Sequence, residues 1–440
     1  MGSLSEDNAL HLAPVVVPRA GLQAPSELHL LRGRGRLRMS VALVGPAFVA
    51  AVAYVDPGNF ATNVTAGADY GYSLVWVVLA ANLIAMVVQY LSAKVGVATG
   101  RDLAELCRQS YHPAVSRGMW VQAELVAMAT DLAEFVGAAL GLNLLFGVPM
   151  FPAGVITAVV AYGLLALQQR GHRHYELAIA GLLGIVCLGF SYDLAKVHVD
   201  WPGAAAGVVP HFADGNAVVL AGGIIGATVM PHVVYLHSAL TKSRVGCADG
   251  AERQELMRFQ RADVLLALGA AGLINLSMVL VAASLFHGNP GLVVDSIHAA
   301  HSGLAEKVGG GAALAFAVAL LASGLGSSSV GTYAGQVVMQ GFIKRRISLF
   351  LRRGLTMLPA LVVLGLGLPP TQSLVLSQVV LSFGIPFALI PLVLLTRRSD
   401  LMGALVNRTS TTVVAAVVTV LIVSLNAYII LSAFGWGPAA

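Results

Sequence analysis

The fold of this 440-residue chain is decided by the stretch Ala53-Tyr54-Val55-Asp56-Pro57-Gly58-Asn59. The stretch lies inside a long and otherwise apolar run. Pro57 has no N–H and cannot make the helical hydrogen bond to the preceding turn, and Gly58 removes the steric preference for helix. We therefore expect a helix that stops and restarts here, with free carbonyls near Ala53 beside the side chains of Asp56 and Asn59.

Burying the carboxylate of Asp56 in an apolar span costs free energy. Ionisable side chains inside membrane-spanning segments carry a large desolvation cost and usually mark a path for ions or substrate. Non-helical backbone at membrane depth is tolerated only where it is buried in protein or lines a cavity. A proline kink whose charge faces the bundle is the simpler alternative. Because a kink does not need Asp, Pro, Gly and Asn together, we interpret the stretch as a binding site.

The composition indicates a polytopic membrane protein with one membrane domain. The chain is 57% hydrophobic and 11% charged, with a mean hydropathy of +0.80. Soluble domains contain about 25% charged residues. The net charge of +5 does not predict nucleic-acid binding, because the basic residues fall in short loops. The three cysteines, Cys107, Cys187 and Cys247, form neither a disulfide framework nor a metal cluster, and no cleaved signal peptide is expected.

Apolar segments of about 20 residues predict membrane-spanning helices. There are eleven: 43–66, 73–96, 118–146, 152–169, 175–193, 217–240, 262–286, 310–341, 355–367, 374–396 and 412–434. With the N-terminus inside, all of the 26 Lys and Arg residues lie in inside loops or at inner helix ends except Lys196 and Lys307. The positive-inside rule therefore predicts a cytoplasmic N-terminus and an external C-terminus.

The sixth span contains a second break, Gly226-Ala227-Thr228-Val229-Met230-Pro231-His232. Pro231 interrupts this helix as Pro57 interrupts the first. Interrupted helices at matching positions in two halves are typical of inverted-repeat transporters with a site at the midplane. The symmetry rests on the two breaks and the topology, since no residue-level repeat is visible. The expected domains are a cytoplasmic tail (1–42), a first five-helix repeat (43–193), an extracellular loop (194–216), a second five-helix repeat (217–396), and an eleventh helix with the C-terminus (397–440).

Together the two breaks offer a mixed set of ligands. They contain the Asp56 carboxylate, the Asn59 amide oxygen, the Met230 thioether, and the freed carbonyls near Ala53 and Ala227. Oxygen ligands alone suit Mg²⁺, Ca²⁺ or Na⁺, whereas a thioether favours softer transition metals. The set predicts Mn²⁺ or Fe²⁺, with Cd²⁺ as an adventitious tight binder. The alternative for Met230 is a packing role.

Further polar residues are candidates for the same site or for a proton path. Gln378 in the tenth span can reach the ion in a closed state or bond a neighbouring helix. Asp131 and Glu134 share one face of the third span and suggest a proton relay. Arg352 and Arg353 can neutralise these acids. An ion pair that breaks in one state of the transporter can also act as a gate. His232 can accept or pass a proton near neutral pH.

These motifs resemble those of the Nramp family of proton-coupled divalent metal transporters. The residues that carry the resemblance are Asp56-Pro57-Gly58-Asn59, Met230-Pro231-His232, Tyr235-Leu236-His237-Ser238, Gly331-Thr332-Tyr333-Ala334-Gly335-Gln336, Met339 and Gly341-Phe342. The likeness covers residues 40–435. It implies an all-α LeuT-like 5+5 inverted repeat with discontinuous helices 1 and 6, plus an eleventh transmembrane helix.

The resemblance also implies roles for single residues. Metal ligation falls to Asp56, Asn59, Met230 and the carbonyls of Ala53 and Ala227. Proton movement falls to His232, Asp131, Glu134 and Arg353, with Asp56 as a proton acceptor. Many relatives follow Met-Pro-His with Asn-Leu, where this chain has Val233-Val234. Relatives that carry magnesium or aluminium depart at the position of Asn59 or Met230, and this chain does not.

The sequence therefore predicts a secondary transporter of the bacterial inner membrane that imports Mn²⁺, Fe²⁺ and similar metals with protons. The expected partners are divalent metal ions, protons and the lipid bilayer, without nucleic acid, an obligate protein partner or a cofactor. A sodium-coupled small-solute carrier of the same architecture is the main alternative. An intramembrane metalloprotease needs a His-Glu-x-x-His run, which this sequence lacks. The sequence does not exclude a channel. Accumulation of the metal against its gradient distinguishes a carrier from a channel.

Overall fold

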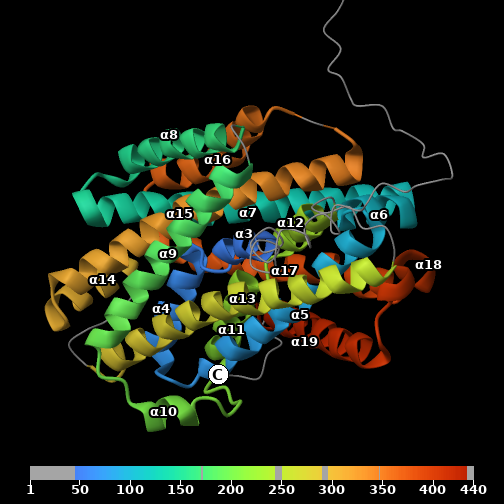
Figure 1. The fold of residues 1–440 in the computed structure, drawn as a ribbon. Coiled ribbons are helices and arrows are strands. Elements are labelled where there is room, and N and C mark those ends of the chain that lie inside the picture. Colours follow the sequence, from blue (N-terminus) through green and yellow to red (C-terminus); the bar gives the residue numbers. More distant parts are fainter. Residues whose placement is uncertain (1–44, 170–171, 243–249, 290–295, 346, 434–440) are drawn as a thin grey trace, which may run out of the picture.

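The computed structural model describes residues 45–169, 172–242, 250–289, 296–345 and 347–433. Over these residues the chain is helical, and no strand occurs. The tail predicted for residues 1–42 lies outside them. Figure 1 shows long helices crossing one another around a central group that contains α3, α4, α11 and α12, with α10 and α14 at the periphery.

The first and sixth apolar segments are each a pair of helices. The pairs are α3 (Pro46–Ala53) with α4 (Pro57–Tyr70), and α11 (Gly215–Thr228) with α12 (Pro231–Lys242). The other long helices are α5 (Val75–Thr99), α7 (Pro113–Phe146), α8 (Met150–Gln169), α9 (His172–Lys196), α13 (Gly250–Phe286), α15 (Gly310–Ile343), α16 (Leu349–Gly365), α17 (Pro370–Thr396) and α19 (Thr409–Ala433). Each of the eleven predicted segments thus coincides with a helix or a helix pair.

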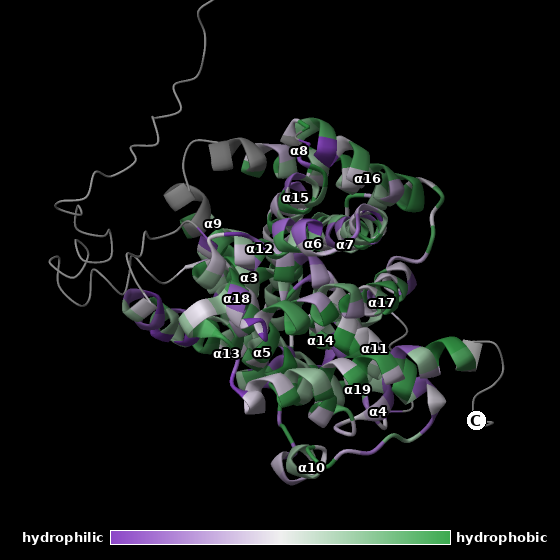
Figure 2. Ribbon diagram, turned by 90° about the vertical axis from the view of Figure 1, so that its right-hand side faces the viewer, coloured by the Kyte–Doolittle hydropathy of each residue, from purple (hydrophilic) through white to green (hydrophobic). Residues whose placement is uncertain are grey.

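Among the described residues, eight helical stretches are long and apolar enough to cross a membrane by themselves, with α11 and α12 counted together. Three predicted spans fall short for visible reasons. The first is divided into α3 and α4, α8 has only a short apolar stretch among its described residues, and α16 has 17 residues with Pro359 inside. In Figure 2 the outer helices α16 and α19 are largely hydrophobic in colour, as expected of surfaces that face lipid.

Several short helices lie between the spans. They are α6 (Leu103–Ser110), α10 (Trp201–Ala206), α14 (Ile297–Lys307), α18 (Ser399–Met402) and the 3₁₀ helix η1 (Gly403–Leu405). Asp102 begins α6 with a capping box, in which its side chain accepts from Glu105 N and Glu105 accepts from Asp102 N. Such amphipathic helices lack the long apolar run that identifies a span, so segment counting does not predict them.

Close approaches at glycine place the two breaks against their neighbours. A Cβ atom added at Gly137 of α7 would lie 2.0 Å from the Cβ of Pro57, so α7 packs directly on the first break. A Cβ at Gly58 would lie 1.9 Å from Nε2 of Gln378, and one at Gly226 would lie 2.1 Å from the Gln378 carbonyl oxygen. Small residues permit such contacts between membrane helices. They bring α7 and α17 to the centre of the bundle.

Candidate metal-binding site

In each helix break, the proline leaves one carbonyl of the preceding turn without its helical hydrogen bond. Residues 54–56 and 229–230 are not helical. In a continuous helix the N–H of a residue bonds the carbonyl four residues earlier. Because proline has no N–H, Pro57 cannot bond the carbonyl of Ala53 and Pro231 cannot bond that of Ala227. The Ala227 oxygen instead accepts a hydrogen bond from Asn59 Nδ2 at 3.1 Å.

Asp56 and Asn59 form the polar centre of the first break. Asp56 Oδ1 accepts hydrogen bonds from the backbone N and the side-chain Nδ2 of Asn59, each at 2.8 Å. The hydroxyl of Thr228 donates to Asn59 Oδ1 at 3.2 Å, which joins the second break to the first. Asp56 is completely buried, and its Oδ2 atom has no hydrogen-bond partner. A buried carboxylate oxygen without a partner is costly unless a proton or a cation neutralises it.

Met230 and Gln378 complete the enclosure of this centre. Met230 lies in the second break, two residues after Thr228, and is fully buried. Gln378 of α17 lies across both breaks, with its side chain against Gly58 and its backbone against Gly226. Its Oε1 atom is buried without a hydrogen-bond partner. A carboxylate, amides and a carbonyl therefore meet at one buried place, and the buried Met230 belongs to the break that supplies the carbonyl.

The chemistry of this donor set fits a divalent transition metal in transit. The described residues contain no group of three or more His, Cys, Asp or Glu side chains that could hold a metal, so they offer no multi-anionic chelating site. One carboxylate combined with neutral oxygens and a thioether can bind Mn²⁺ or Fe²⁺ and still release it. Of the sequence-predicted ligands, Asp56, Asn59 and the Ala227 carbonyl are joined by hydrogen bonds. The role of the full set in binding metal stays a prediction.

Three residues at the breaks were not identified from the sequence. Besides Thr228, Asn275 of α13 donates to the Tyr54 carbonyl at 2.9 Å, and Ser323 of α15 donates to the Val55 carbonyl. These bonds satisfy two carbonyls that the first break leaves without helical partners. An amide inside a predicted span was the available signal for Asn275. Nothing in the sequence shows which break such a side chain serves.

The acids of α7 meet two arginines of α16 separately. Arg353 donates from Nη1 to Asp131 Oδ1 at 2.9 Å and to Thr332 Oγ1 at 3.0 Å, and it also bonds Ser328. Arg353 is only 1% exposed. Arg352 instead forms a bidentate pair with Glu124, at 2.6 and 3.1 Å. Only one of the two arginines therefore contacts the predicted proton path.

Glu134 forms no ion pair of its own among the described residues, although the Arg353 guanidinium attracts its carboxylate. It is fully buried, and in this part of the chain neither carboxylate oxygen has a hydrogen-bond partner. It faces Gly331 of α15, where an added Cβ would lie 2.8 Å from Glu134 Oε2 and 3.4 Å from Asp131 Oδ1. Asp56 is near enough to interact with Glu134 electrostatically. Glu134 thus lies between the first break and the Arg353–Asp131 pair.

His232 of α12 contacts α7 rather than the groups of the metal centre. Its Nδ1 atom lies 3.4 Å from the hydroxyl of Thr130, and its Nε2 atom is buried without a partner. The described contacts include no hydrogen bond between His232 and Asp56. Thr130 and Glu134 are four residues apart and share one face of α7, so His232 contacts the face of α7 that carries Glu134.

Polar contacts join the interrupted helices to their neighbours on one side of the site. His237 Nδ1 lies 2.8 Å from Gln89 Oε1, and Gln89 donates to the Tyr54 hydroxyl. Farther along α12, Lys242 Nζ lies 2.5 Å from Asp102 Oδ2 and 3.1 Å from Glu105 Oε2.

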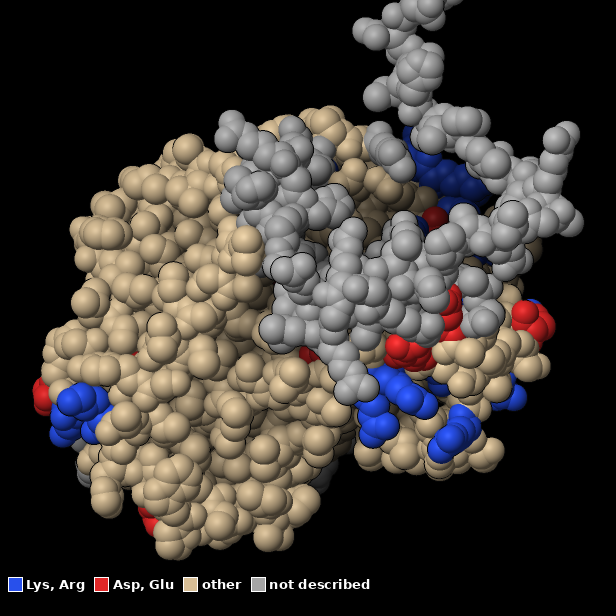
Figure 3. All heavy atoms as spheres, in the orientation of Figure 1, with Lys and Arg blue, Asp and Glu red and all other residues tan. Residues whose placement is uncertain are grey.

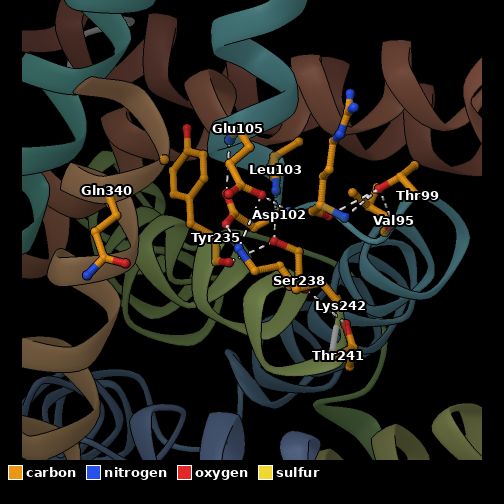
Figure 4. Close-up of polar contacts among 12 residues, drawn as sticks. Val95, Thr99, Asp102, Leu103, Glu105, Tyr235, Ser238, Thr241, Lys242 and Gln340 are labelled. Carbon is orange, nitrogen blue, oxygen red and sulfur yellow. Dashed lines mark hydrogen bonds and ion pairs between the residues drawn. The ribbon is translucent and has the colours of Figure 1, made fainter. Parts of the chain in front are cut away.

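Figure 4 shows the ion pairs of Lys242 with Asp102 and Glu105. It also shows the hydrogen bond of 3.0 Å that the Leu103 N–H donates to the Ser238 hydroxyl. The end of α12 is therefore fastened to α6 and to the loop before it. Burial raises the pKa of the Asp102 carboxyl, which pairs with Lys242. Burial also acts to raise the pKa of Glu105, but the hydrogen bonds that Glu105 accepts from the Asp102 N–H and from Lys242 outweigh it and lower that pKa.

The opposite ends of the interrupted helices are joined through Asp214. Its side chain caps α11 by accepting from Ala217 N at 2.7 Å and accepts from the Tyr70 hydroxyl, at the end of α4, at 2.9 Å. The Ala217 N–H, followed by the Tyr70 hydroxyl, holds the pKa of the Asp214 carboxyl below its usual range. The site is thus bracketed by polar contacts at both ends.

This chain is similar in sequence and structure to known membrane transporters. Residues 47–432 match the family model described as "Natural resistance-associated macrophage protein-like", Nramp. The chain is 50% identical to the divalent metal cation transporter MntH of Deinococcus radiodurans, over 93% of this chain and 97% of that protein. It superposes on the Eremococcus coleocola manganese transporter with a TM-score of 0.82 and 32% identity, covering 92% and 90% of the two chains.

A more distant likeness concerns the fold alone. Mhp1, a nucleobase-cation-symport-1 family transporter, matches with a TM-score of 0.60 at 16% identity, over 87% of this chain and 88% of the other. The predicted LeuT-like architecture with two discontinuous helices is thereby confirmed.

Proposed function

The chain belongs to the Nramp family, and we propose that it imports Mn²⁺, Fe²⁺ and similar divalent metals such as Cd²⁺ into the cytoplasm, coupled to proton movement. Family membership makes it a membrane transporter rather than an enzyme. We further propose a bacterial inner-membrane location with the N-terminus cytoplasmic and the C-terminus outside, because nearly all Lys and Arg then lie in or near the cytoplasm.

The observation that carries the metal proposal is the meeting of Asp56, Asn59 and Met230 at the two breaks. The carboxylate supplies the negative charge that a divalent cation requires, and the thioether favours a transition metal over Ca²⁺ or Mg²⁺. The carbonyls of Ala53 and Ala227 and the Gln378 side chain supply further oxygen donors. In the alternative, a sodium-coupled carrier of the same fold, a thioether beside the only carboxylate has no evident purpose.

Proton coupling is supported by the arrangement of the acids around the site. A carboxylate must be deprotonated to bind a metal, so metal binding at Asp56 releases a proton. Glu134 is near enough to interact electrostatically with Asp56, and the Arg353–Asp131 pair lies beyond it. We propose that the proton moves from Asp56 to Glu134 and Asp131, with His232 taking part through Thr130. Arg352 is bound to Glu124, which gives it at most an indirect part.

The test is transport by the purified protein in proteoliposomes, with internal pH and Mn²⁺ recorded together. We expect Mn²⁺ to enter against its gradient when the outside is acidic, and the interior to acidify only when Mn²⁺ is present. Strictly downhill Mn²⁺ movement without proton entry would indicate a channel. Uptake driven by a Na⁺ gradient, with no response to pH, would favour the sodium-coupled alternative.

A further inference from the structure

A second cavity lies away from the metal centre, between the ends of α5, α13 and α19. It has a volume of about 680 Å³. Four basic residues line it: Lys94 of α5, Arg258 and Arg261 of α13, and Arg408 immediately before α19. None of the described lining residues is acidic. In Figure 3 one group of Lys and Arg side chains lies at the lower right, on the side where α13 and α19 begin, and others lie at the upper right and at the far left.

The positive charges of this cavity are not neutralised by the described part of the chain. Arg258, Arg261 and Arg408 form no ion pair there. Lys94 is only 6% exposed, and its ammonium donates to Asn407 Oδ1 at 2.7 Å and lies 5.8 Å from the centre of the Tyr90 ring. These partners are neutral. A buried cation with neutral partners costs free energy that an anion would recover.

The cavity also presents neutral donors suited to an anion. Ser410 and Thr411 line it from the first turn of α19, a helix of 25 residues. The free N–H groups and the dipole at a helix N-terminus favour negative charge. Arg258 and Arg261 are three residues apart on α13 and reach the same cavity. Guanidinium groups bind phosphate through two parallel hydrogen bonds.

An apolar wall continues from the basic end of the cavity onto the outer surface. Leu265 of α13 and Val414 of α19 line the cavity and are each 49% exposed. Met86 and Val87 of α5 line it as well. Both helices belong to predicted membrane spans, so these exposed side chains face lipid. A ligand that extends along this wall needs a phosphate at one end and a hydrocarbon chain at the other.

We propose that this cavity binds the headgroup of an anionic phospholipid. The phosphate lies among the four basic residues, and one acyl chain follows Leu265 and Val414 into the bilayer. Basic pockets between transmembrane helices on the cytoplasmic side bind such headgroups. The lipid joins α5 and α13, which pack on the interrupted helices, to α19. The site is independent of metal binding, and the proposed orientation assigns it to the inner leaflet.

The test is a titration of the detergent-solubilised protein with phosphatidylglycerol or phosphatidylcholine, read by native mass spectrometry. The variant Arg258→Gln/Arg261→Gln removes two exposed charges from the cavity. A matched control, Arg345→Gln/Arg397→Gln, removes two exposed charges on the same proposed side outside it. Each basic residue contributes about 1 kcal/mol to attraction by anionic lipid. We expect phosphatidylglycerol to bind the cavity variant roughly 20- to 30-fold more weakly than wild type, and the control to bind it like wild type.

Further arms distinguish the source of the phosphate and the state of the protein. Inorganic phosphate is expected not to displace the bound lipid, and thermal unfolding in phosphatidylcholine is expected to be the same for both double variants. Equal loss of phosphatidylglycerol in the two variants, or equal binding of both lipids by wild type, would overturn the proposal. Displacement of the bound lipid by millimolar phosphate would overturn the proposal and indicate that the cavity binds a soluble anion instead.

Discussion

The side-chain amide of Asn59 donates a hydrogen bond of 3.1 Å to the carbonyl oxygen of Ala227, 168 residues away in the chain. Asn59 lies in the first turn after one break, and Ala227 lies in the last turn before the other. The two breaks are thus joined by a hydrogen bond between two of the groups that are proposed to bind the metal.

Asp56 provides the only carboxylate at the two breaks, so Asp56→Asn is expected to abolish metal binding. Neutral donors compensate poorly for the dehydration of a divalent cation. Partners that merely orient a metal ligand contribute about 10- to 100-fold to affinity, so the loss is expected to exceed about 100-fold. Isothermal titration of the purified variant with Mn²⁺ measures it. Asp193→Asn, at a buried position of α9 outside the proposed site, is the control. Near-native affinity of Asp56→Asn would remove this carboxylate from the site.

Met230→Ala is expected to retain Mn²⁺ transport and to lose discrimination against Ca²⁺. The thioether adds little for hard cations and favours transition metals, so its removal eliminates the preference rather than the site. Uptake of Mn²⁺ in excess Ca²⁺ measures the change. Truncating a buried methionine also costs about 2–5 kcal/mol of stability, and Met278→Ala, at a buried position of α13, controls for that loss. Unchanged exclusion of Ca²⁺ by Met230→Ala would mean that Met230 is a packing residue.

Gly58 and Gly226 both contact Gln378, but through different atoms, and this difference predicts a selective rescue. An added Cβ meets the side chain of Gln378 at Gly58 and its backbone oxygen at Gly226. Either substitution to alanine is expected to disfavour this closed arrangement by about 1–3 kcal/mol and to reduce Mn²⁺ uptake. Because Gln378 is also a proposed metal donor, the rescue is read by thermal unfolding rather than by uptake. Adding Gln378→Ala is expected to restore the stability of Gly58→Ala and not that of Gly226→Ala. Equal rescue of both variants would contradict the proposed packing.

The sequence was sufficient for the spans and the two breaks because both depend on local chemistry. Apolar length identifies a span, and a proline removes a known hydrogen bond wherever it occurs in a helix. Which arginine meets which acid was not predictable. Glu124 and Asp131 are seven residues apart on one face of α7, and successive residues on a helix point in directions about 100° apart. Arg352 and Arg353 therefore reach different acids, and only the rotation of α16 against α7 decides the pairing.

Asp214 is expected to stabilise the protein equally from pH 8 to pH 5 and to lose this effect progressively as the pH falls below the unfolded pKa of about 3.9. Its pKa is lower in the folded chain than in the unfolded chain, where it is about 3.9. Such a group stabilises the fold above the unfolded pKa, and the contribution disappears as pH falls through the folded value. Thermal unfolding of wild type and Asp214→Ala at pH 7.5, 5.0 and 3.0 tests this. A difference that changes between pH 7.5 and 5.0 would contradict the assignment.

Glu134 carries the last prediction, which concerns proton coupling. It lies near Asp56 without a hydrogen-bond partner, whereas Asp131 is paired with Arg353. Glu134→Gln preserves shape and removes the proton-accepting charge, so Mn²⁺ binding is expected to stay near the wild-type level while metal-stimulated proton entry falls. Glu124→Gln is the control, since it removes an acid that pairs with Arg352 outside the path.

Asp131→Asn is expected to have a mixed effect, because it leaves the buried Arg353 without its anion and breaking such a pair costs about 3–5 kcal/mol. Its proton flux is therefore interpretable only together with its thermal unfolding. Parallel Mn²⁺ and proton fluxes in proteoliposomes separate the two acids. If Glu134→Gln keeps the wild-type ratio of protons to metal and the wild-type pH profile, Glu134 is structural. The proton released at Asp56 then leaves by another route, for which the His232–Thr130 contact on α7 is the next candidate.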